Sequence, residues 1–457
     1  MKNQRSSQIN RRQFVKQAGL GAALFNILPS RMIDGAEAPA PGGKLNVAGI
    51  GIGSQGGRDV EEVAKLGHNI VALCDVDHKY AAKEFEKHPG AKRFTDYRKM
   101  LDQMKEIDAV VIGTPDHTHA VIAMEAMKRG KHVYCEKPLA HSVEEIRKLM
   151  AAADQHKVVT QLGNQGHSSD SIRRLCEWVW AGAIGKVHTV HAGCDAFKNV
   201  YSQISNLPKL AERHEVPEHL DYDLWLGPVQ PRPYSPLWVH WNWRGWLPFG
   251  GGTIGDWICH VVDPAFWALD LGAPTSILAE AKDYDPDQHG LTYPGAARFT
   301  FEFPAKGERG PVKLVWHDGD ETIPRPEGFH PDEKVPGTGA ILVGDQGMIV
   351  HGSHGAGSCH LVPDTLNEKY AGKNAPEQKI PRVKGHAWDW VEAIREGRKA
   401  GSNFGYGGPL TEIALLGLIA LRYPGKKLEW DSQGMRFTNH LAANTHLRKT
   451  YRPGWSV

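Results

Sequence analysis

The chain has 457 residues, of which 41% are hydrophobic and 23% charged, and its formal net charge at pH 7 is +2. A chain of this length exceeds what one ordinary hydrophobic core supports, so we expect two domains. The near-neutral charge disfavours nucleic acid as the main partner. Its six cysteines are scattered and form no C-x-x-C pair, which argues against a zinc site and against a disulfide framework.

Residues 1–43 are typical of a targeting segment followed by a linker. The run Asn10-Arg11-Arg12-Gln13-Phe14 precedes an apolar stretch from Ala18 to Leu28. This arrangement resembles the twin-arginine export signal, which the twin-arginine translocation machinery of the bacterial inner membrane recognises. We therefore expect a periplasmic or otherwise exported protein. The alternative is an N-terminus without a targeting role. Cleavage of the segment stays open, because Pro39 and Pro41 follow its small-residue sites.

A glycine-rich motif follows the first predicted strand. Residues 45–50 form an apolar strand, residues 58–66 have helical character, and Gly51-Ile52-Gly53-Ser54-Gln55-Gly56 lies between them. Strand, GxGxxG and helix in this order are typical of a dinucleotide-binding site. The first glycine permits a tight turn, the second lets the backbone approach the pyrophosphate, and the third allows the helix to pack closely on the strand. The N-terminus of the helix then directs N–H groups at the phosphates.

An acidic residue follows the second predicted strand, residues 68–74. Asp75 lies at the spacing from the glycine motif, about 20 residues, at which a carboxylate binds the ribose hydroxyls of NAD and repels the extra phosphate of NADP. We therefore predict NAD rather than NADP. The alternative is a glycine-rich turn followed by an ordinary solvated aspartate.

The alternation of strands and helices continues to about residue 165. Strands are predicted at 109–112, 132–135 and 158–162, and helices at 120–129 and 142–156. Ser142 and Glu145 form a capping box at the start of the second of these helices. Alternating strands and helices predict a parallel, doubly wound sheet over residues 44–165, with its ligand at the carboxyl ends of the strands.

Four motifs together resemble the glucose–fructose oxidoreductase / inositol dehydrogenase / MocA family. They are the glycine motif, Thr114-Pro115 with His119, Glu136-Lys137-Pro138, and the run from Gly250 to His260. The resemblance covers nearly everything after residue 44. It implies an α/β protein in which a Rossmann domain precedes an α/β domain, here residues 166–457, whose large, open, mostly antiparallel sheet covers the nicotinamide. Phenylalanines at 299, 301 and 303 alternate with polar neighbours, as expected of a sheet with one buried face.

The resemblance assigns the catalytic role to Lys137, Asp256 and His260. Oxidation of an alcohol removes the hydroxyl proton as hydride leaves the carbon, so a base is needed beside the nicotinamide. Asp256 and His260 are four residues apart, which places both on one face of a helix. The residues leave open whether Lys137 or His260 is the base. They also leave open two alternatives, namely that Lys137 is an ordinary solvated lysine and that His260 is a structural residue of the core. No third ligand at fixed spacing accompanies Asp256 and His260, so we predict no metal.

The cofactor contacts expected from the motif and from the resemblance form a larger set. They are Gly51, Gly53, Ser54, Gln55, Gly56, Asp75, Thr114, Pro115, His119, Glu136, Lys137 and Gln165.

Tryptophan is concentrated in one part of the chain. Seven of the fourteen tryptophans lie between Trp225 and Trp267. Indole rings stack on the apolar faces of sugars, so we expect Trp241 or Trp243 to contact a carbohydrate substrate together with Lys137, Asp256 and His260. The alternative is that these rings serve core packing or subunit contacts.

These expectations describe an exported, NAD-dependent oxidoreductase that acts on a hydroxyl of a sugar or glycoside. Free NAD is scarce outside the cytoplasm, so the cofactor should be tightly bound and reoxidised in place. The bound NADH can be reoxidised by a second substrate, by an external acceptor, or by the same substrate after one of its bonds has been cleaved. The last case is a redox-neutral NAD-dependent glycosidase, in which Tyr201, Tyr222 or a pocket histidine supplies an extra base. A non-catalytic sugar-binding protein is the third alternative. The resemblance also implies a homodimer or homotetramer that forms through the C-terminal sheet.

Overall fold

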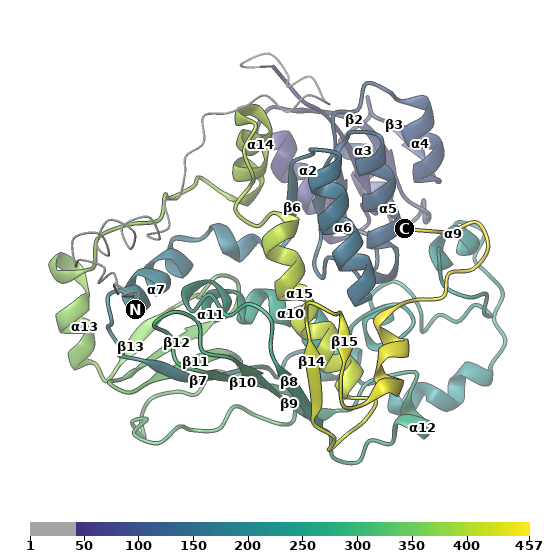
Figure 1. Ribbon diagram of the computed structural model, residues 1–457. Coiled ribbons are helices and arrows are strands. Elements are labelled where there is room, and N and C mark those ends of the chain that lie inside the picture. The colour runs from purple at the N-terminus through teal and green to yellow at the C-terminus, as the bar shows by residue number, and fades with distance from the viewer. Residues whose placement is uncertain (1–42) are drawn as a thin grey trace, which may run out of the picture. The chain divides into compact units, whose positions relative to one another are not determined.

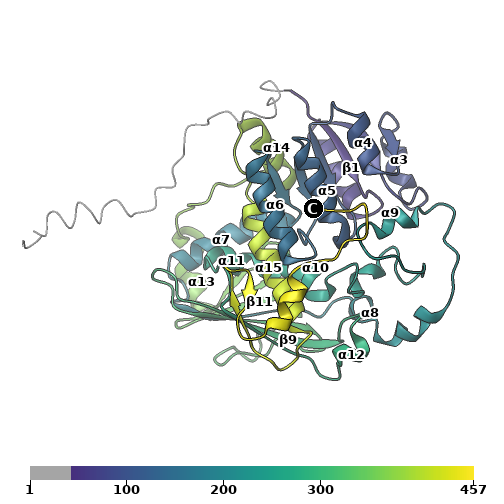
Figure 2. The same cartoon turned by 45° about the vertical axis from the view of Figure 1, so that its right-hand side comes forward.

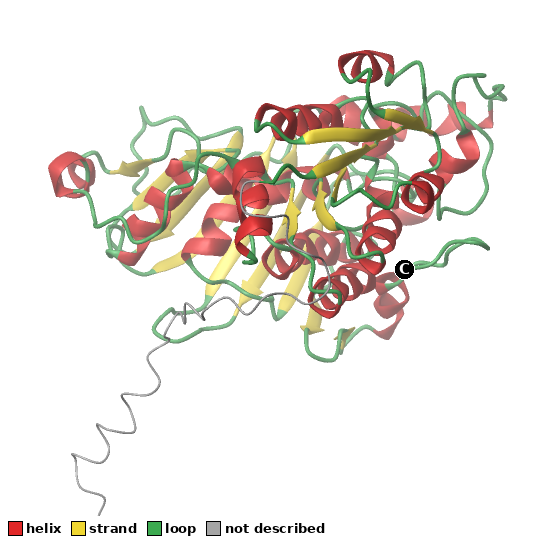
Figure 3. Ribbon diagram, turned by 90° about the horizontal axis from the view of Figure 1, so that it is seen from above, coloured by secondary structure: helices red, strands yellow, loops and turns green. Residues whose placement is uncertain are grey.

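Two β-sheets organise the protein in the computed structural model, which describes residues 43–457 (Figures 1 and 3). The predicted export motif lies outside the described residues. One sheet is parallel and six-stranded, and the other is nine-stranded and mostly antiparallel. The predicted fold class, a doubly wound Rossmann sheet followed by an α/β domain with a large antiparallel sheet, is therefore confirmed.

The first sheet contains the predicted strands and one that was not predicted. Its strands are β1 (Asn46–Ile50), β2 (Asn69–Cys74), β3 (Lys92–Phe94), β4 (Ala109–Ile112), β5 (His132–Cys135) and β6 (Thr160–Leu162), in the order β3-β2-β1-β4-β5-β6. The central strands are apolar and buried on both faces, as parallel sheets require. Strand β3 was not predicted because this three-residue edge strand begins with two exposed basic residues and has no apolar run.

Helices cover both faces of this sheet. They are α2 (Gln55–Lys65), α3 (Ala82–Lys87), α4 (Tyr97–Gln103), α5 (Asp116–Lys128) and α6 (Val143–Gln155). The predicted cap of α6 is present, because the backbone N–H of Glu145 donates to Oγ of Ser142 at 3.3 Å. Both α2 and α5 begin several residues before their predicted starts, since their first turns consist of glycine or polar residues that carry no apolar periodicity.

The second sheet lies below the Rossmann domain in Figure 1. Its strands are β7 (Val187–Cys194), β8 (Ser276–Glu280), β9 (Ala296–Phe303), β10 (Val312–Gly319), β11 (Thr338–Gly344), β12 (Met348–Gly352), β13 (His360–Val362), β14 (Leu428–Asp431) and β15 (Arg436–Phe437). Their order is β13-β12-β11-β7-β10-β9-β8-β14-β15. The phenylalanines of β9 are buried and alternate with half-buried residues, which confirms the predicted one-sided burial.

The remaining helices belong to the second half of the chain. The α-helices are α7 (Asp170–Trp180), α8 (Lys198–Tyr201), α9 (Tyr222–Leu226), α10 (Gly252–Val261), α11 (Asp263–Ala268), α12 (Pro286–His289), α13 (Thr365–Tyr370), α14 (His386–Glu396) and α15 (Phe404–Ala420). The 3-10 helices are η1 (Gln165–Ser168), η2 (Ile204–Ala211), η3 (Asn242–Gly245), η4 (Gly372–Asn374) and η5 (Leu441–Leu447).

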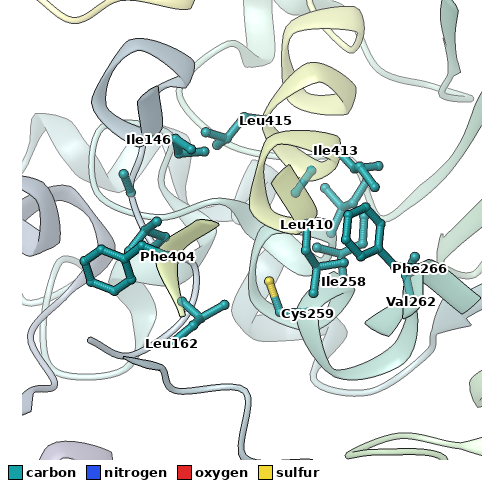
Figure 4. Packing of buried hydrophobic residues seen from close by; sticks show 14 of the residues in the cluster. Ile146, Leu162, Ile258, Cys259, Val262, Phe266, Phe404, Leu410, Ile413 and Leu415 are labelled. Carbon is teal, nitrogen blue, oxygen red and sulfur yellow. The ribbon is translucent and has the colours of Figure 1, made fainter. Parts of the chain in front are cut away.

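Helix α15 joins the two halves of the protein. It packs on α6 of the Rossmann domain and on α10, which carries the predicted Asp-x-x-x-His pair (Figure 4). A Cβ atom at Gly407 would lie 2.8 Å from Leu162 of β6, so glycine is needed for this close approach. The guanidinium of Arg147 donates two hydrogen bonds to the buried carboxylate of Glu412, at 2.7 and 2.6 Å. These contacts fix the position of α10 relative to the cofactor-binding sheet.

Two further observations concern membrane-spanning helices and cysteines. Among residues 43–457, no helix combines the length and the apolar character needed to cross a membrane. All six cysteines are free, and five of them are buried.

Candidate active site

A cavity of about 430 Å³ lies between the carboxyl ends of the Rossmann strands and helix α10. Nearly every predicted site residue lines it. These residues are Gly51, Gly53, Ser54, Gln55, Asp75, Thr114, Pro115, Glu136, Lys137, Gln165, Trp241, Trp243, Asp256 and His260. Two predicted cofactor residues, Gly56 and His119, lie behind the cavity wall.

The glycine motif forms a cradle that side chains would fill. Gly51 has a φ of +75°, and a Cβ atom there would lie 2.5 Å from the side chain of Thr114. A Cβ atom at Gly56 would lie 2.2 Å from the carbonyl oxygen of Gly51, so Gly56 closes the turn without reaching the cavity. Gly53 lines the cavity at the N-terminal end of α2, where free N–H groups favour an anion. The cradle therefore fits the pyrophosphate of a dinucleotide.

Asp75 supports this cradle as well as lining the cavity. Its carboxylate accepts hydrogen bonds from the backbone N–H groups of Ile52 at 2.8 Å, Gly53 at 3.1 Å and Asp77 at 2.9 Å. Burial raises the pKa of Asp75 to about 6. Oδ2 accepts two of these bonds and Oδ1 one, so Oδ1 has a further lone pair that fits a ribose hydroxyl. The sequence predicted the second role and gave no sign of the first.

His119 has a structural position that corrects its predicted contact with the cofactor. Its Nδ1 lies 2.8 Å from the carbonyl oxygen of Pro138, and its Nε2 lies 2.8 Å from that of Thr114. Burial lowers its pKa to about 4, so the ring is neutral near pH 7. A neutral imidazole donates from only one ring nitrogen, so one of these two contacts is a hydrogen bond. The ring lies between Pro138, which follows Lys137, and Thr114, which lines the cavity.

Glu136 lies at the end of β5 in a low-dielectric environment. Burial and the neighbouring carboxylate of Asp59 raise its pKa well above the usual range, and the pKa of Asp59 rises to about 7, mainly through burial. Gln55 donates a hydrogen bond to Asp59 at 2.9 Å. The carboxyl group of Glu136 accepts a hydrogen bond from the backbone N–H of Lys137 at 3.3 Å and lines the cavity, where it can also contact a polar cofactor group.

Lys137, Asp256 and Tyr201 form a buried chain of polar contacts. Nζ of Lys137 donates to Oδ1 of Asp256, and the hydroxyl of Tyr201 donates to Oδ2 at 2.5 Å. The indole N–H of Trp257 donates to the Tyr201 hydroxyl at 2.7 Å. Nε of Arg244 lies 3.3 Å from Oδ2 of Asp256. Asp256 is therefore the centre of a network that joins the Rossmann domain to α8, α10 and η3.

The charges in this network have defined protonation states. Burial opposes ionisation of Asp256, but the charges of Lys137 and Arg244 outweigh it and hold its pKa well below the usual range. Burial also opposes the charge on Lys137, but Asp256 and Glu136 outweigh it and hold the pKa of Lys137 above its ordinary value. Burial and the charge of Asp256 raise the pKa of Tyr201. Near pH 7 the network is thus an ion pair with a neutral phenol.

His260 lies one turn after Asp256 on α10, as predicted, and it also lines the cavity. Its ring stacks on the more exposed ring of His354, with a centroid distance of 4.1 Å. Burial and the charge of Lys137 hold its pKa well below the ordinary value, so the imidazole is neutral. Its buried Nδ1 has no hydrogen-bond partner among the described residues. Because the carboxylate of Asp256 accepts hydrogen bonds from Lys137 and Tyr201, the ring of His260 is oriented instead by its stacking on His354.

Exposed aromatic rings form the rim of the cavity. Phe197 is 54% exposed and Trp241 is 39% exposed, and their rings meet edge to face with centroids 6.2 Å apart. The guanidinium of Arg244 lies 3.9 Å from the ring centroid of Trp241 and 4.2 Å from that of Trp243. This rim supports the expected substrate contact of Trp241.

Other tryptophans of the same region serve the core. Trp225, Trp238, Trp243 and Trp246 pack with Phe249 in a separate hydrophobic cluster, as the packing alternative anticipated.

Several site residues were not singled out from the sequence. His354 and Trp455 line the cavity but occur in no motif, whereas Arg244 was one of several polar candidates in the tryptophan-rich region and Tyr201 one of several possible bases. Because the hydroxyl of Tyr201 donates its hydrogen bond to Asp256, Tyr201 does not suit the role of a base. Tyr222 lies outside the cavity lining and donates to the carbonyl oxygen of Pro233 at 3.1 Å. Within residues 43–457, no group of three or more His, Cys, Asp or Glu side chains is placed to hold a metal ion.

Two family models match the chain. Residues 45–164 match "Oxidoreductase family, NAD-binding Rossmann fold", and residues 170–300 match "Oxidoreductase family, C-terminal alpha/beta domain".

Curated relatives include both dehydrogenases and a glycosidase-family protein. Levoglucosan dehydrogenase of Pseudarthrobacter phenanthrenivorans is 25% identical over 244 residues, which cover 53% of this chain and 52% of the relative. Inositol 2-dehydrogenase of Rubrobacter xylanophilus is 32% identical over 145 residues, covering 31% of this chain and 41% of the relative. These matches span about half or less of each dehydrogenase. Glycosyl hydrolase family 109 protein 2 of a Shewanella species is 26% identical over 379 residues, covering 80% of this chain and 74% of the relative.

Solved structures share the fold at low identity. Aldose-aldose oxidoreductase from Caulobacter crescentus, complexed with glycerol, is 18% identical, with a TM-score of 0.55 over 85% of this chain and 100% of that one. An inositol dehydrogenase homolog from Azotobacter vinelandii, complexed with NADH and myo-inositol, is 15% identical, with a TM-score of 0.55 over 87% of this chain and 100% of that one. With both family models matched in succession, the chain belongs to the oxidoreductase family of glucose–fructose oxidoreductase, inositol dehydrogenase and MocA.

Proposed function

We propose that the protein is an NAD-dependent oxidoreductase that oxidises a hydroxyl group of a sugar or glycoside and retains its cofactor between turnovers. The observation that carries this proposal is the arrangement of Lys137, Asp256 and His260 in the same cavity as the glycine cradle. A cationic donor and a neutral imidazole beside a dinucleotide site are the groups that alcohol oxidation needs. Sugar-acting dehydrogenases among the relatives support the choice of substrate class.

The chemistry follows from the protonation states of these residues. A dinucleotide held by the glycine cradle would supply the hydride acceptor through its nicotinamide. The substrate carbon loses a hydride, and the hydroxyl proton passes to the neutral ring of His260, which serves as the general base. The ammonium group of Lys137 stabilises the negative charge that develops on the substrate oxygen. Asp256 and Tyr201 position Lys137.

NAD is proposed over NADP because Asp75 places a buried carboxyl group beside the glycine cradle. Even with its pKa raised to about 6, Asp75 is largely ionised near pH 7. A negative charge there repels the extra phosphate of NADP.

A redox-neutral glycosidase is the second candidate, because the relative that covers 80% of this chain is a glycosyl hydrolase family 109 protein. In that reaction, oxidation of one hydroxyl acidifies the neighbouring C–H bond. A base then removes that proton and the glycosidic C–O bond breaks, water adds to the resulting double bond, and the hydride returns to the carbonyl carbon. His354 is the best placed extra base, because it lines the cavity beside His260.

The first experiment adds no cofactor. Purified protein is mixed with a panel of sugars and glycosides, while absorbance of the reduced nicotinamide and release of aglycone are followed together. Net oxidation predicts a rise to a plateau of one reduced cofactor per chain. Aglycone release without lasting reduced cofactor assigns the glycosidase reaction instead. If no sugar changes either signal in protein shown to contain NAD, the proposed function is wrong.

Export and assembly are proposed on different grounds. The twin-arginine motif supports export of the folded chain, and a retained cofactor is what an enzyme needs where free NAD is scarce. The large open sheet, whose other face packs on α7, α10, α11 and α15, supports a homodimer or homotetramer through this sheet. Light scattering of the purified protein tests the second proposal, because a monomeric mass contradicts it.

A further inference from the structure

We propose that the C-terminal tail, residues 448–457, is part of the cofactor site and that Trp455 closes its adenine end. This inference rests on the proposed function, because it concerns how the dinucleotide is retained. The tail lies against the Rossmann domain in both Figure 1 and Figure 2, near α5 and α9.

The two ends of the cavity are distinguished by the order of the strands. Lys137 and Gln165 follow β5 and β6, on the side where the catalytic groups and therefore the nicotinamide lie. Asp75 follows β2, and Thr95 to Tyr97 follow β3, on the opposite side of β1. A dinucleotide lies across the switch point of such a sheet, so the β2–β3 side takes the adenosine half. Trp455 lines the cavity at this end, together with Leu224 and Trp225.

The indole ring of Trp455 is held from two sides. The guanidinium of Arg98, which follows β3, lies 4.7 Å from the ring centroid, and that of Arg452 lies 5.6 Å from it. Arg98 is itself fixed by two hydrogen bonds of 3.0 Å to the carboxylate of Asp96. A Cβ atom at Gly227 would lie 3.9 Å from the indole, so this ring also packs on the end of α9. The ring therefore contacts both the Rossmann domain and the second domain.

The rest of the tail is anchored by hydrogen bonds to both domains. Arg452 is 9% exposed and donates to the carbonyl oxygen of Gly227 at 2.5 Å, to Oδ1 of Asp223 at 2.5 Å and to the carbonyl oxygen of Asp223 at 2.6 Å. The hydroxyl of Tyr451 donates to the carboxylate of Glu145 on α6 at 2.8 Å. These bonds to both domains keep the tail in place, so Trp455 acts as a fixed wall.

Such a wall affects release of the cofactor more than the chemistry. An aromatic contact to a base changes affinity by about 5- to 150-fold when it is removed. Because Trp455 lies at the adenine end, its removal should speed dissociation of a dinucleotide and leave a ligand that lacks adenine unaffected. The tail therefore supplies part of the tight retention that the proposed function requires.

The experiment compares full-length wild type with Trp455→Ala, Trp455→Phe, Arg452→Ala and the control Trp180→Ala. Trp180 is also partly exposed, at 45%, but lies on α7 outside the cavity lining. Fluorescence of the reduced dinucleotide is followed after mixing with excess oxidised NAD. Binding of reduced nicotinamide mononucleotide is measured in parallel, and circular dichroism checks that each variant is folded.

We expect Trp455→Ala and Arg452→Ala to release the dinucleotide about 5- to 150-fold faster than wild type. The release rate of Trp455→Phe should lie between those of wild type and Trp455→Ala, and Trp180→Ala should release the dinucleotide at the wild-type rate. Affinity for the mononucleotide should stay within twofold in all variants. Equal release rates in wild type and Trp455→Ala overturn the closure of the adenine end but leave the oxidoreductase proposal standing. An equal loss for the mononucleotide also overturns it. A wild-type protein that binds no dinucleotide overturns both proposals.

Discussion

Asp256 organises the charges at the centre of the site. It accepts hydrogen bonds from Lys137 and Tyr201 and lies near Arg244, so one carboxylate balances two cations. Removal of one partner from such a buried cluster leaves an uncompensated charge, which costs more than the pair itself contributes. Lys137 is thereby held cationic, and His260 beside it is held neutral. This division of roles supports His260 as the proposed base, a choice that the sequence left open.

A pH profile tests this division of roles. His260 stays neutral above its depressed pKa, and Lys137 stays cationic below its raised pKa. We therefore expect the single-turnover rate of cofactor reduction to be nearly constant from about pH 6 to 8. His260→Asn should lower it by about 10²- to 10⁴-fold. A rate that rises about tenfold per pH unit over this range would instead identify neutral Lys137 as the base.

Trp241 is the rim residue expected to contact substrate. Its ring is partly exposed, whereas the ring of Trp243 is 6% exposed and packed in a core cluster. Trp241→Ala should raise KM for a sugar substrate by about 5- to 13-fold, because a ring contact of about 1–1.5 kcal/mol is lost, with a smaller effect on kcat. Steady-state kinetics on the substrate found by the panel measure this split. Unchanged KM in both Trp241→Ala and Trp243→Ala contradicts the proposed sugar contact.

Asp75 is the residue expected to select the cofactor. Asp75→Asn keeps the shape and one carbonyl oxygen to accept from the glycine loop, but it removes the negative charge. We expect affinity for NADP relative to NAD to rise by about tenfold, equivalent to about 1.4 kcal/mol. Titration of cofactor-free protein with each dinucleotide measures the ratio. Asp154→Asn, at a surface position on α6, is the control that should leave it unchanged. An unchanged ratio in Asp75→Asn means that another group excludes NADP.

At the scale of secondary structure, α10 and α15 decide where the catalytic residues lie. Helix α10 presents Asp256 and His260 to the cavity, and α15 fills the space between α10 and α6 (Figure 4). The apolar residues of α15 are buried all round, so this helix lacks the amphipathic stripe of a surface helix. A change in its packing should therefore disturb stability before it disturbs chemistry.

Leu410 tests the packing of α15. It is fully buried on this helix, and truncation there removes apolar contacts and leaves a cavity. We expect Leu410→Ala to lower the free energy of unfolding by about 2–5 kcal/mol. The matched control is Leu441→Ala, whose side chain is 74% exposed and whose substitution should change stability by less than about 0.5 kcal/mol. Urea denaturation followed by circular dichroism gives both values. A loss below 1 kcal/mol at Leu410 would show that this part of the core repacks.

At the scale of the whole molecule, the active site belongs to neither domain alone. The Rossmann domain supplies the glycine cradle, Asp75 and Lys137, and the second half of the chain supplies Asp256, His260 and the aromatic rim. The segment before α9 reaches back to the adenosine side, where the backbone N–H of Asp221 donates to the carbonyl oxygen of Val76 at 2.8 Å. Burial of the cofactor between two halves of one chain suits an enzyme that retains it.

The proposed export concerns the entire folded chain, because the twin-arginine machinery carries folded proteins. The double variant Arg11→Lys, Arg12→Lys keeps the charge but alters the proposed signal. In a bacterial host with this pathway, we expect the variant to remain in the cytoplasmic fraction while wild type reaches the periplasm. Lys2→Arg is the charge-conserving control and should be exported. Equal periplasmic amounts of wild type and the double variant contradict the proposed route.

Local patterns predicted the Rossmann sheet and the contents of its site. Buried parallel strands are continuous apolar runs, and the glycine cradle, Asp75 and Lys137 each follow such a strand directly. The helical spacing of Asp256 and His260 placed both on one face of α10, as observed. The short strand β3 and the polar first turns of α2 and α5 escaped prediction because they lack apolar periodicity.

By itself, then, the sequence determined what local patterns dictate: the parallel sheet, the dinucleotide motif and the helical spacing of Asp256 and His260, whose proposed catalytic role with Lys137 came from the family resemblance. Tertiary structure alone decided which of these residues bond to one another. Tyr201 and Arg244 meet Asp256, His354 stacks on His260, and Trp455 reaches the far end of the cavity. Each of these residues comes from a loop or a short helix, where no periodic sequence pattern indicates which way a side chain points. Their positions depend on how α15 packs the two domains together, and that packing sums many weak contacts between residues far apart in the chain.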